Sequence, residues 1–179
     1  IPLVGVNHMH GHIAAAYLQY KDLEPPFLTL LVSGGHTNLV HVTDYNRCEM
    51  VGETRDDAVG EAYDKIAVVM GLGYPGGPKI DACAKSGNSG AIDFKRVRLE
   101  KGSLDFSFSG LKTQVLNYLG RERMRGNPVN REDVCASFQQ AAIDVLVEKT
   151  IAAAEKCGVS KVTASGGVAA NSLLRKMLK

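Results

Sequence analysis

Two histidines, His8 and His12, lie four residues apart near the start of the chain. Residues at this spacing share one face of a helix, where two neutral imidazoles can bind a single metal ion. The zinc peptidase pattern H-E-x-x-H needs Glu directly after the first histidine, and this chain has Met9 there. His10 falls on another side of the same helix. The pair predicts a metal site that needs a further ligand, with capping or core histidines as the alternative.

Three glycine-bearing segments follow, at residues 32–37 (VSGGHT), 74–81 (YPGGPKID) and 164–171 (ASGGVAAN). Glycine after a strand lets backbone N–H groups approach an anion with no Cβ in the way. In the last segment a helix begins after the glycines, so its N-terminus can face a phosphate or a nucleoside. Glycine pairs also form plain hairpins. Together with the histidines, the segments predict a site for a metal and a phosphorylated ligand.

Polar side chains near these glycines are candidates for ligand contacts. Asp64 ends the polar face of a predicted helix, and Asp81 follows Gly77, where small residues leave room for a flat ligand. Carboxylates bind paired ribose hydroxyls in dinucleotide-binding folds. Asn171 can bond a ligand hydroxyl or base. The alternative for each residue is a helix cap or a surface charge.

Composition is that of an ordinary globular protein. The 179 residues are 45% hydrophobic and 22% charged, with a net charge of +2. No apolar run is long enough to cross a bilayer, and the first residues do not resemble a signal peptide. Four cysteines without a C-x-x-C pair exclude a zinc ribbon and favour free thiols in a reducing cytosol. Basic clusters at residues 95–98 and 121–131 are either solvated charges or contacts to a phosphate backbone.

The hydrophobic pattern predicts an α/β fold with a mixed sheet. Asp56 or Asp57 is expected to cap the second helix. Residues 71–110 are rich in glycine and show little periodicity. The chain begins without Met and ends inside a helical pattern, so we expect a fragment of a longer protein. Strands are expected at residues 1–6, 27–33, 37–43, 48–52 and 161–164. Helices are expected at residues 8–20, from Asp56 or Asp57 to about residue 70, from near residue 109, at residues 130–157, and from about residue 169.

Six motifs, in this order, resemble the TsaD family, also called YgjD or Gcp and once labelled O-sialoglycoprotein endopeptidase. The resemblance runs the whole length of the chain. It implies an actin/Hsp70-like (ASKHA, ribonuclease H-like) α/β lobe with a mixed sheet flanked by helices. Residues 1–22 are then the end of an N-terminal lobe with the metal-binding helix, and 23–179 a C-terminal lobe with a glycine-rich insertion at about 71–110. The motifs are VNHMHGH, LLVSGGHT, GETRDDAVGEAYDK, YPGGPKID, LDFSFSGLKT and SGGVAAN.

The resemblance implies a tRNA N6-adenosine threonylcarbamoyltransferase. Such an enzyme transfers a threonylcarbamoyl group from threonylcarbamoyl-adenylate to the exocyclic amine of the adenosine next to the anticodon. Its tRNA substrates read codons that start with A. Implied cofactors are a divalent metal, iron before zinc, with adenylate or ATP as ligand. Implied partners are tRNA and TsaB- and TsaE-like proteins in the cytoplasm, without a membrane.

The resemblance also assigns roles to individual residues. His8 and His12 match the family's metal ligands. Matches to the substrate-binding positions are Leu31, Val32, Ser33, Gly34, Gly35, Asp64, Gly77, Asp81 and Asn171. No residue is implied as a covalent nucleophile.

Two family features are missing from this chain: an early G-I-E-T-S-C-D-E-T segment and a late T-D-N-G motif whose aspartate is the third metal ligand. We therefore expect the chain alone to be inactive. Two other functions stay open. One is a metal-dependent (glyco)protein endopeptidase, which the missing Glu argues against, and the other is a non-catalytic nucleotide-binding scaffold.

Overall fold

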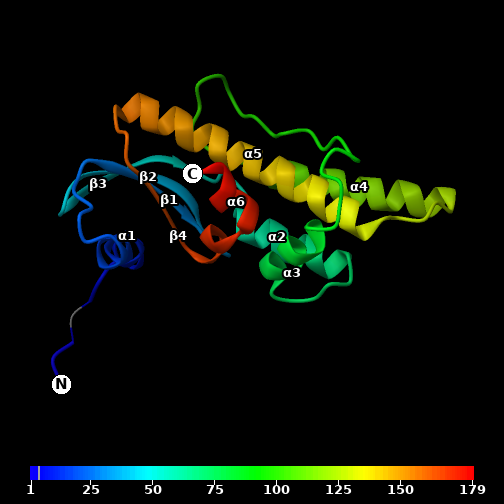
Figure 1. Ribbon diagram of the computed structural model, residues 1–179, viewed down its shortest axis with the longest axis horizontal. Coiled ribbons are helices and arrows are strands. Elements are labelled where there is room, and N and C mark those ends of the chain that lie inside the picture. Colours follow the sequence, from blue (N-terminus) through cyan, green and yellow to red (C-terminus); the bar gives the residue numbers. More distant parts are fainter. Residues whose placement is uncertain (4) are drawn as a thin grey trace.

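A four-stranded mixed sheet forms the centre of the fold (Figure 1). The computed structural model describes residues 1–3 and 5–179. Strands β1 (Phe27–Val32), β2 (Thr37–Asp44) and β3 (Arg47–Glu53) form an antiparallel meander, and β4 (Val162–Ser165) pairs in parallel with β1. The strand order is β3-β2-β1-β4. The predicted meander and mixed sheet are confirmed.

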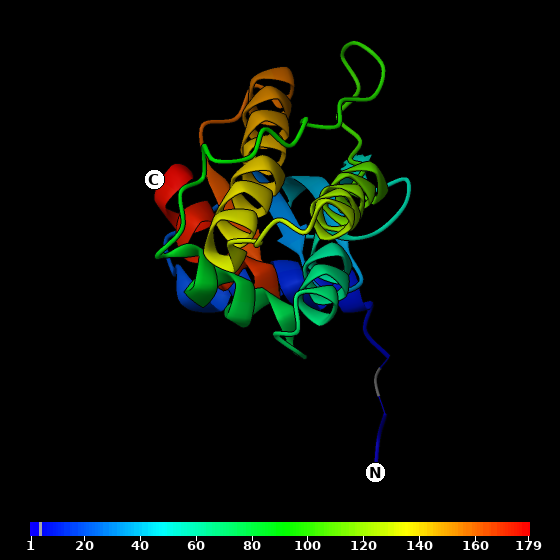
Figure 2. The same cartoon turned by 90° about the vertical axis from the view of Figure 1, so that its right-hand side faces the viewer.

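Helices cover both faces of this sheet (Figures 1 and 2). Successive strand residues point to opposite faces. Leu28 and Leu30 of β1 therefore join the main core with α5 (Arg131–Cys157) and α2 (Val59–Val69). Phe27 and Leu31 instead join a smaller core with Ile13 of α1 (His8–Gln19). The helix that carries His8 and His12 is thus held against the sheet by apolar packing.

The long helix α5 has the predicted start and end. The Asn130 side chain accepts a hydrogen bond from the Asp133 N–H, and Gly158 ends the helix with φ 66°. A left-handed residue after the last turn is the usual place for glycine. Helix α4 (Ser109–Arg125) also begins where predicted.

The predicted cap of α2 is wrong. Ala58 precedes that helix and supplies no side-chain cap. Asp56 instead accepts hydrogen bonds from the N–H groups of Phe108, at 2.8 Å, and Ser109, at 3.2 Å, at the start of α4. Asp57 forms ion pairs with Lys65 and Lys112. Sequence proximity favoured a local cap, but Asp56 bonds to the start of α4, and Asp57 bonds to the side chains of Lys65 and Lys112 instead of to the first N–H groups of α2.

The predicted first strand is also wrong. Residues 1–3 and 5–7 have no regular structure, and Val4 lies outside the described residues. Leu3 is 96% and Val6 83% exposed. In both views residues 1–3 lie away from the body of the protein, and they pair with no strand of the described residues (Figures 1 and 2). An apolar, β-branched segment forms a strand only beside a partner.

A helix was missed in the glycine-rich segment. Helix α3 (Gly76–Ala84) packs between α2 and α5 and buries Ile80. Its first residue must be small, because a Cβ on Gly76 would lie 2.6 Å from the Tyr63 carbonyl oxygen. Its small residues give little hydrophobic periodicity. The last elements are a 3-10 helix, η1 (Gly167–Ala170), and α6 (Ser172–Met177).

Charged side chains near residues 95–98 pair within the protein. Arg96 contacts Asp144 at 2.6 Å, Arg98 contacts Glu148 at 2.8 Å, and Lys95 pairs with Asp93. All four cysteines are free. No helix in the part of the chain that the structure describes combines the length and apolar character needed to span a membrane.

Candidate functional site

The candidate site begins where β1 and β4 end. Since these strands are parallel neighbours, their carboxyl ends lie at the same edge of the sheet, where ligands bind in open α/β folds. Gly166, after β4, has φ 99°, and a Cβ there would lie 2.2 Å from the Val32 carbonyl oxygen. A Cβ on Gly60 would lie 2.4 Å from the Ser33 carbonyl oxygen. Only glycines allow these segments to meet so closely.

His8 and His12 each meet one of the two glycine turns. Their rings are in edge contact, with centroids 4.7 Å apart. The His8 ring centroid is 5.7 Å from that of His36, in the turn after β1. His12 Nδ1 lies 3.3 Å from the Ser165 hydroxyl oxygen, at the end of β4. The imidazole pair and both turns therefore converge.

The donor set fits part of a divalent metal site. A hydrogen bond to one ring nitrogen orients a ligating histidine and leaves the other nitrogen for the metal, and Ser165 can do this for His12. Among residues 1–3 and 5–179, no group of three or more His, Cys, Asp or Glu side chains is arranged to hold a metal. The structure thus offers two imidazole ligands and no complete site.

A cavity of about 430 Å³ lies beside the first turn, between α2, α3 and η1. Five residues predicted for substrate binding border it: Gly34, Asp64, Gly77, Asp81 and Asn171. The other four do not border it. Leu31 and Val32 are buried within β1. Ser33 and Gly35 flank Gly34, and the Ser33 hydroxyl accepts hydrogen bonds from the N–H groups of Gly35 and His36.

The polar residues of the cavity also hold the fold together. Asp64 accepts a hydrogen bond from the Gly76 N–H at 2.7 Å, at the start of α3. Asp81 accepts from the Ser172 hydroxyl at 2.7 Å, which joins α3 to α6. The helix predicted from residue 169 would contain Asn171, but Asn171 is the N-cap of α6, and its side chain accepts hydrogen bonds from the Leu173 and Leu174 N–H groups. Each side chain therefore has a structural role as well as a place at the cavity wall.

Sequence reasoning missed several cavity residues. Tyr63 is fully buried, and its hydroxyl has no hydrogen-bond partner among the described residues. Burial, with a smaller contribution from the Asp81 charge, raises the pKa of Tyr63. Lys85 brings a positive charge to the same wall. Lys85 follows Asp81 by four residues, a spacing that would have placed both on one face had the helix been predicted.

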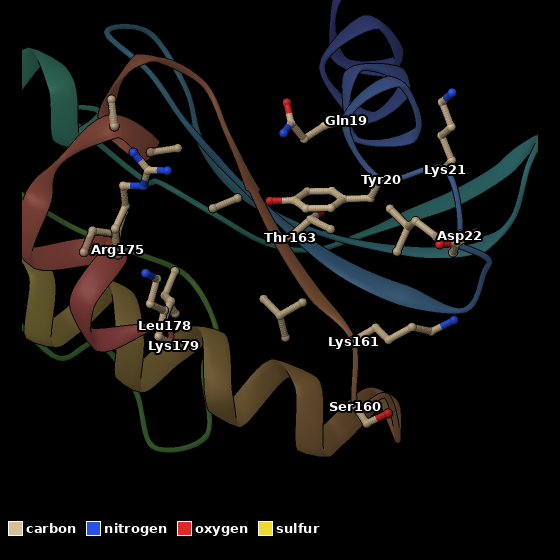
Figure 3. A pocket seen from close by; sticks show the side chains of 16 residues that line it. Gln19, Tyr20, Lys21, Asp22, Ser160, Lys161, Thr163, Arg175, Leu178 and Lys179 are labelled. Carbon is tan, nitrogen blue, oxygen red and sulfur yellow. The ribbon is translucent and has the colours of Figure 1, made fainter.

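A larger open hollow, of about 1000 Å³, lies elsewhere (Figure 3). It is bordered by Tyr20 after α1, by Lys161 just before β4, by Thr163 within β4, and by Arg175 of α6. The close-up shows the side chains of Tyr20, Lys161 and Arg175 around this hollow (Figure 3). None of the residues predicted for the site lines this hollow. The cavity with Asp81 and Asn171 is therefore the candidate site.

Solved structures share this fold at low sequence identity. Full-length HypF in its phosphate- and nucleotide-bound form matches 99% of the chain with TM-score 0.75 and 13% identity, over 38% of its own length. Component A of (R)-2-hydroxyglutaryl-CoA dehydratase from Acidaminococcus fermentans matches 95% of the chain with TM-score 0.54 and 16% identity, over 56% of its own length. The predicted α/β lobe of the actin-like class is confirmed.

Curated relatives are much more similar in sequence. The tRNA N6-adenosine threonylcarbamoyltransferase of Clostridium botulinum (strain 657 / Type Ba4) is 57% identical over 177 residues, 99% of this chain and 52% of that protein. The protein of the same name from Clostridioides difficile (strain 630) is 59% identical over 175 residues, 98% of this chain and 52% of that protein. The chain spans about half the length of these relatives. A family model described as TsaD, tRNA N6-adenosine threonylcarbamoyltransferase, matches residues 1–179, and the chain belongs to this family.

Proposed function

We propose that the protein containing this chain transfers a threonylcarbamoyl group from threonylcarbamoyl-adenylate to the exocyclic amine of the anticodon-adjacent adenosine in tRNA. One observation carries the proposal: His8 and His12 meet the glycine turns at the ends of β1 and β4, beside a cavity bordered by Asp64, Asp81 and Asn171. Family membership and the names of the relatives support the same activity.

The cavity residues are proposed to bind the adenylate part of the donor. About 430 Å³ is within the usual range for a small-molecule pocket. Asp81 and Asp64 can accept hydrogen bonds from ribose hydroxyls, as carboxylates do in nucleotide folds. At Gly34 and Gly77 no atom beyond the neighbouring residues and the local helix backbone lies within 4 Å of the position that a Cβ would take, so a ligand can approach the backbone closely. Lys85 adds a positive charge that suits a phosphate.

His8 and His12 are proposed as two ligands of a divalent metal, with iron preferred over zinc. The third ligand is proposed to be an aspartate from another part of the longer protein. When bound, the metal supplies Lewis-acid polarisation of the donor. Ser165 fixes the His12 ring, and His36 lies against His8. These residues position the donor. In the transfer, the adenosine amine attacks the carbonyl carbon of the threonylcarbamoyl group, AMP leaves, and the amine loses a proton. The catalytic contribution is positioning and electrostatics.

The partners follow from the reaction. The substrate is proposed to be tRNA that reads codons starting with A, and the protein is expected to work in the cytoplasm with TsaB- and TsaE-like proteins. Arg123 lies in the last turn of α4, and Arg131 is the first residue of α5. Neither side chain forms an ion pair among the described residues. They are the part of the second basic cluster that is open to a phosphate backbone.

Ligand binding tests the cavity without requiring activity. AMP binding to the 179-residue chain is measured by calorimetry, with Asp81→Asn as the variant and Asp22→Asn, on the exposed surface, as its matched control. Asp81→Asn is expected to weaken binding at least about tenfold, equivalent to about 1.4 kcal/mol, and Asp22→Asn to leave it unchanged. If both variants bind AMP equally, Asp81 does not contact the adenylate. If the unaltered chain does not bind AMP, the cavity is not the adenylate site.

Activity tests the reaction in the full-length protein. With tRNA, the adenylate donor and partner proteins, the modified adenosine should form and His8→Ala should abolish it. Product formation by the His8→Ala protein would exclude the metal from the mechanism. Protein cleavage without tRNA modification would favour the endopeptidase alternative.

A further inference from the structure

His10 is the histidine of the HMHGH motif that the candidate site leaves unused. It lies two residues from both His8 and His12, so it projects from a different side of α1. There it meets strand β3: the Cys48 sulfur lies 3.5 Å from His10 Nε2. None of the residues around this contact lines the adenylate cavity. The contact is therefore separate from the proposed catalytic site.

The spacing of the two atoms suits a tetrahedral metal. Zinc bonds of about 2.3 Å to sulfur and about 2.0 to 2.1 Å to nitrogen, at a tetrahedral angle, place the two ligand atoms about 3.6 Å apart. The observed separation is 3.5 Å. Thiolate and imidazole are ligands that zinc and similar transition metals prefer over magnesium or calcium.

The surroundings leave room for further ligands. A cavity of about 230 Å³ is bordered by His10, Tyr17, Asp44 and Cys48. The Tyr17 hydroxyl is buried and has no hydrogen-bond partner among the described residues. Asp44 brings a carboxylate to the same wall. A metal-bound water in this cavity would give the Tyr17 hydroxyl a hydrogen-bond partner, whereas Asp44 already accepts a hydrogen bond from the Tyr45 N–H at 2.7 Å.

We propose that His10 and Cys48 form a second site for a thiophilic divalent cation of the zinc class, with water in the remaining positions. The site has two protein ligands, and no group of three or more His, Cys, Asp or Glu side chains in the described residues is arranged to hold a metal. Binding is therefore expected to be weaker than at four-ligand zinc sites. The proposal does not depend on the transferase activity.

Cobalt titration of the reduced 179-residue chain tests the site, because Co²⁺ replaces zinc and gives a near-ultraviolet charge-transfer band only when a thiolate binds it. The band is expected in the unaltered chain and in His8→Ala. It is expected to disappear in Cys48→Ser and His10→Ala and to persist in Cys157→Ser, which removes another half-buried thiol. No band in the unaltered chain, or a band that survives Cys48→Ser, would overturn the proposal and leave only a hydrogen bond.

A second measurement needs no variant, so it holds even if a substitution prevents folding. Zn²⁺ is expected to slow alkylation of Cys48 by iodoacetamide, followed by mass spectrometry of its peptide, while Cys157 reacts at an unchanged rate. Equal rates for Cys48 with and without Zn²⁺ contradict the proposed ligation.

Discussion

The Ser165 hydroxyl oxygen lies 3.3 Å from His12 Nδ1, although the two residues are 153 positions apart in the chain. The end of β4 therefore orients an imidazole that α1 presents. Partners of ligating histidines commonly contribute about 10- to 100-fold to metal affinity. We predict that Ser165→Ala weakens Zn²⁺ binding by this factor, measured by equilibrium dialysis in a Cys48→Ser background that removes the second proposed site.

Ser160→Ala is the matched control, because Ser160 precedes the same strand and is exposed. It should bind Zn²⁺ like the parent chain. Unchanged affinity in Ser165→Ala would mean that the hydroxyl does not orient the ring in solution.

Gly60 allows the start of α2 to lie against the turn after β1. A Cβ there would meet the Ser33 carbonyl oxygen at 2.4 Å and the Gly34 Cα at 2.8 Å, and backbone atoms cannot move aside cheaply. We predict that Gly60→Ala lowers the free energy of unfolding by about 1–3 kcal/mol or more, measured by urea denaturation. Weaker AMP binding should accompany it, because Gly34 and Gly60 both border the cavity.

Gly120→Ala is the control for that substitution. Gly120 lies inside α4 with nothing within 4 Å of its Cβ position, so alanine should stabilise by about 0.5–1 kcal/mol. Equal effects of the two substitutions would show that the turn and α2 are not in contact.

Asp56 links the start of α4 to the loop before α2. Burial opposes ionisation, but hydrogen bonds from Ser107, Ser109 and the Phe108 N–H outweigh it and hold the pKa of Asp56 below its ordinary value of 3.8. The unfolded chain binds the proton more tightly, so this stabilisation is complete above a pH of about 4 and is lost as pH falls through the folded pKa. We predict that Asp56→Asn lowers stability at neutral pH by about 1–2 kcal/mol and flattens the acid limb of the stability profile.

The measurement is urea denaturation between neutral and acid pH. Asp22→Asn, at an exposed position, should reproduce the parent profile. If the free energy of unfolding of Asp56→Asn falls with acid pH as steeply as that of the parent chain, another carboxylate controls acid stability.

The Tyr63 hydroxyl is buried at the cavity without a hydrogen-bond partner among the described residues. An unsatisfied buried polar group is costly, and the ring, packed 5.0 Å from Phe138 between centroids, is unchanged in phenylalanine. We predict that Tyr63→Phe raises the free energy of unfolding by about 1 kcal/mol, measured in urea. Tyr20→Phe, at a side chain 58% exposed, should have little effect. Destabilisation by Tyr63→Phe would mean that the hydroxyl finds a partner in solution.

Local patterns in the sequence determined much of the fold. Alternating apolar residues predicted the meander, Asn130 and Gly158 marked the ends of α5, and the spacing of His8 and His12 placed both rings on one helix face. Glu61 and Lys65, four residues apart on α2, form an ion pair at 2.7 Å, as residues at this helical spacing can. These features depend on residues a few positions apart, for which period and propensity are sufficient.

Tertiary structure alone decided the rest. Residues 1–3, 5 and 6 have strand-like composition and pair with no strand among the described residues, whereas α3 has little periodicity and forms between α2 and α5. The sequence could not show that Asp56 caps a helix 52 positions away, or that Cys48 meets His10. Such contacts depend on the pairing of β1 with β4 and on the packing of helices across the sheet, which bring distant segments together through long-range burial that no local pattern encodes.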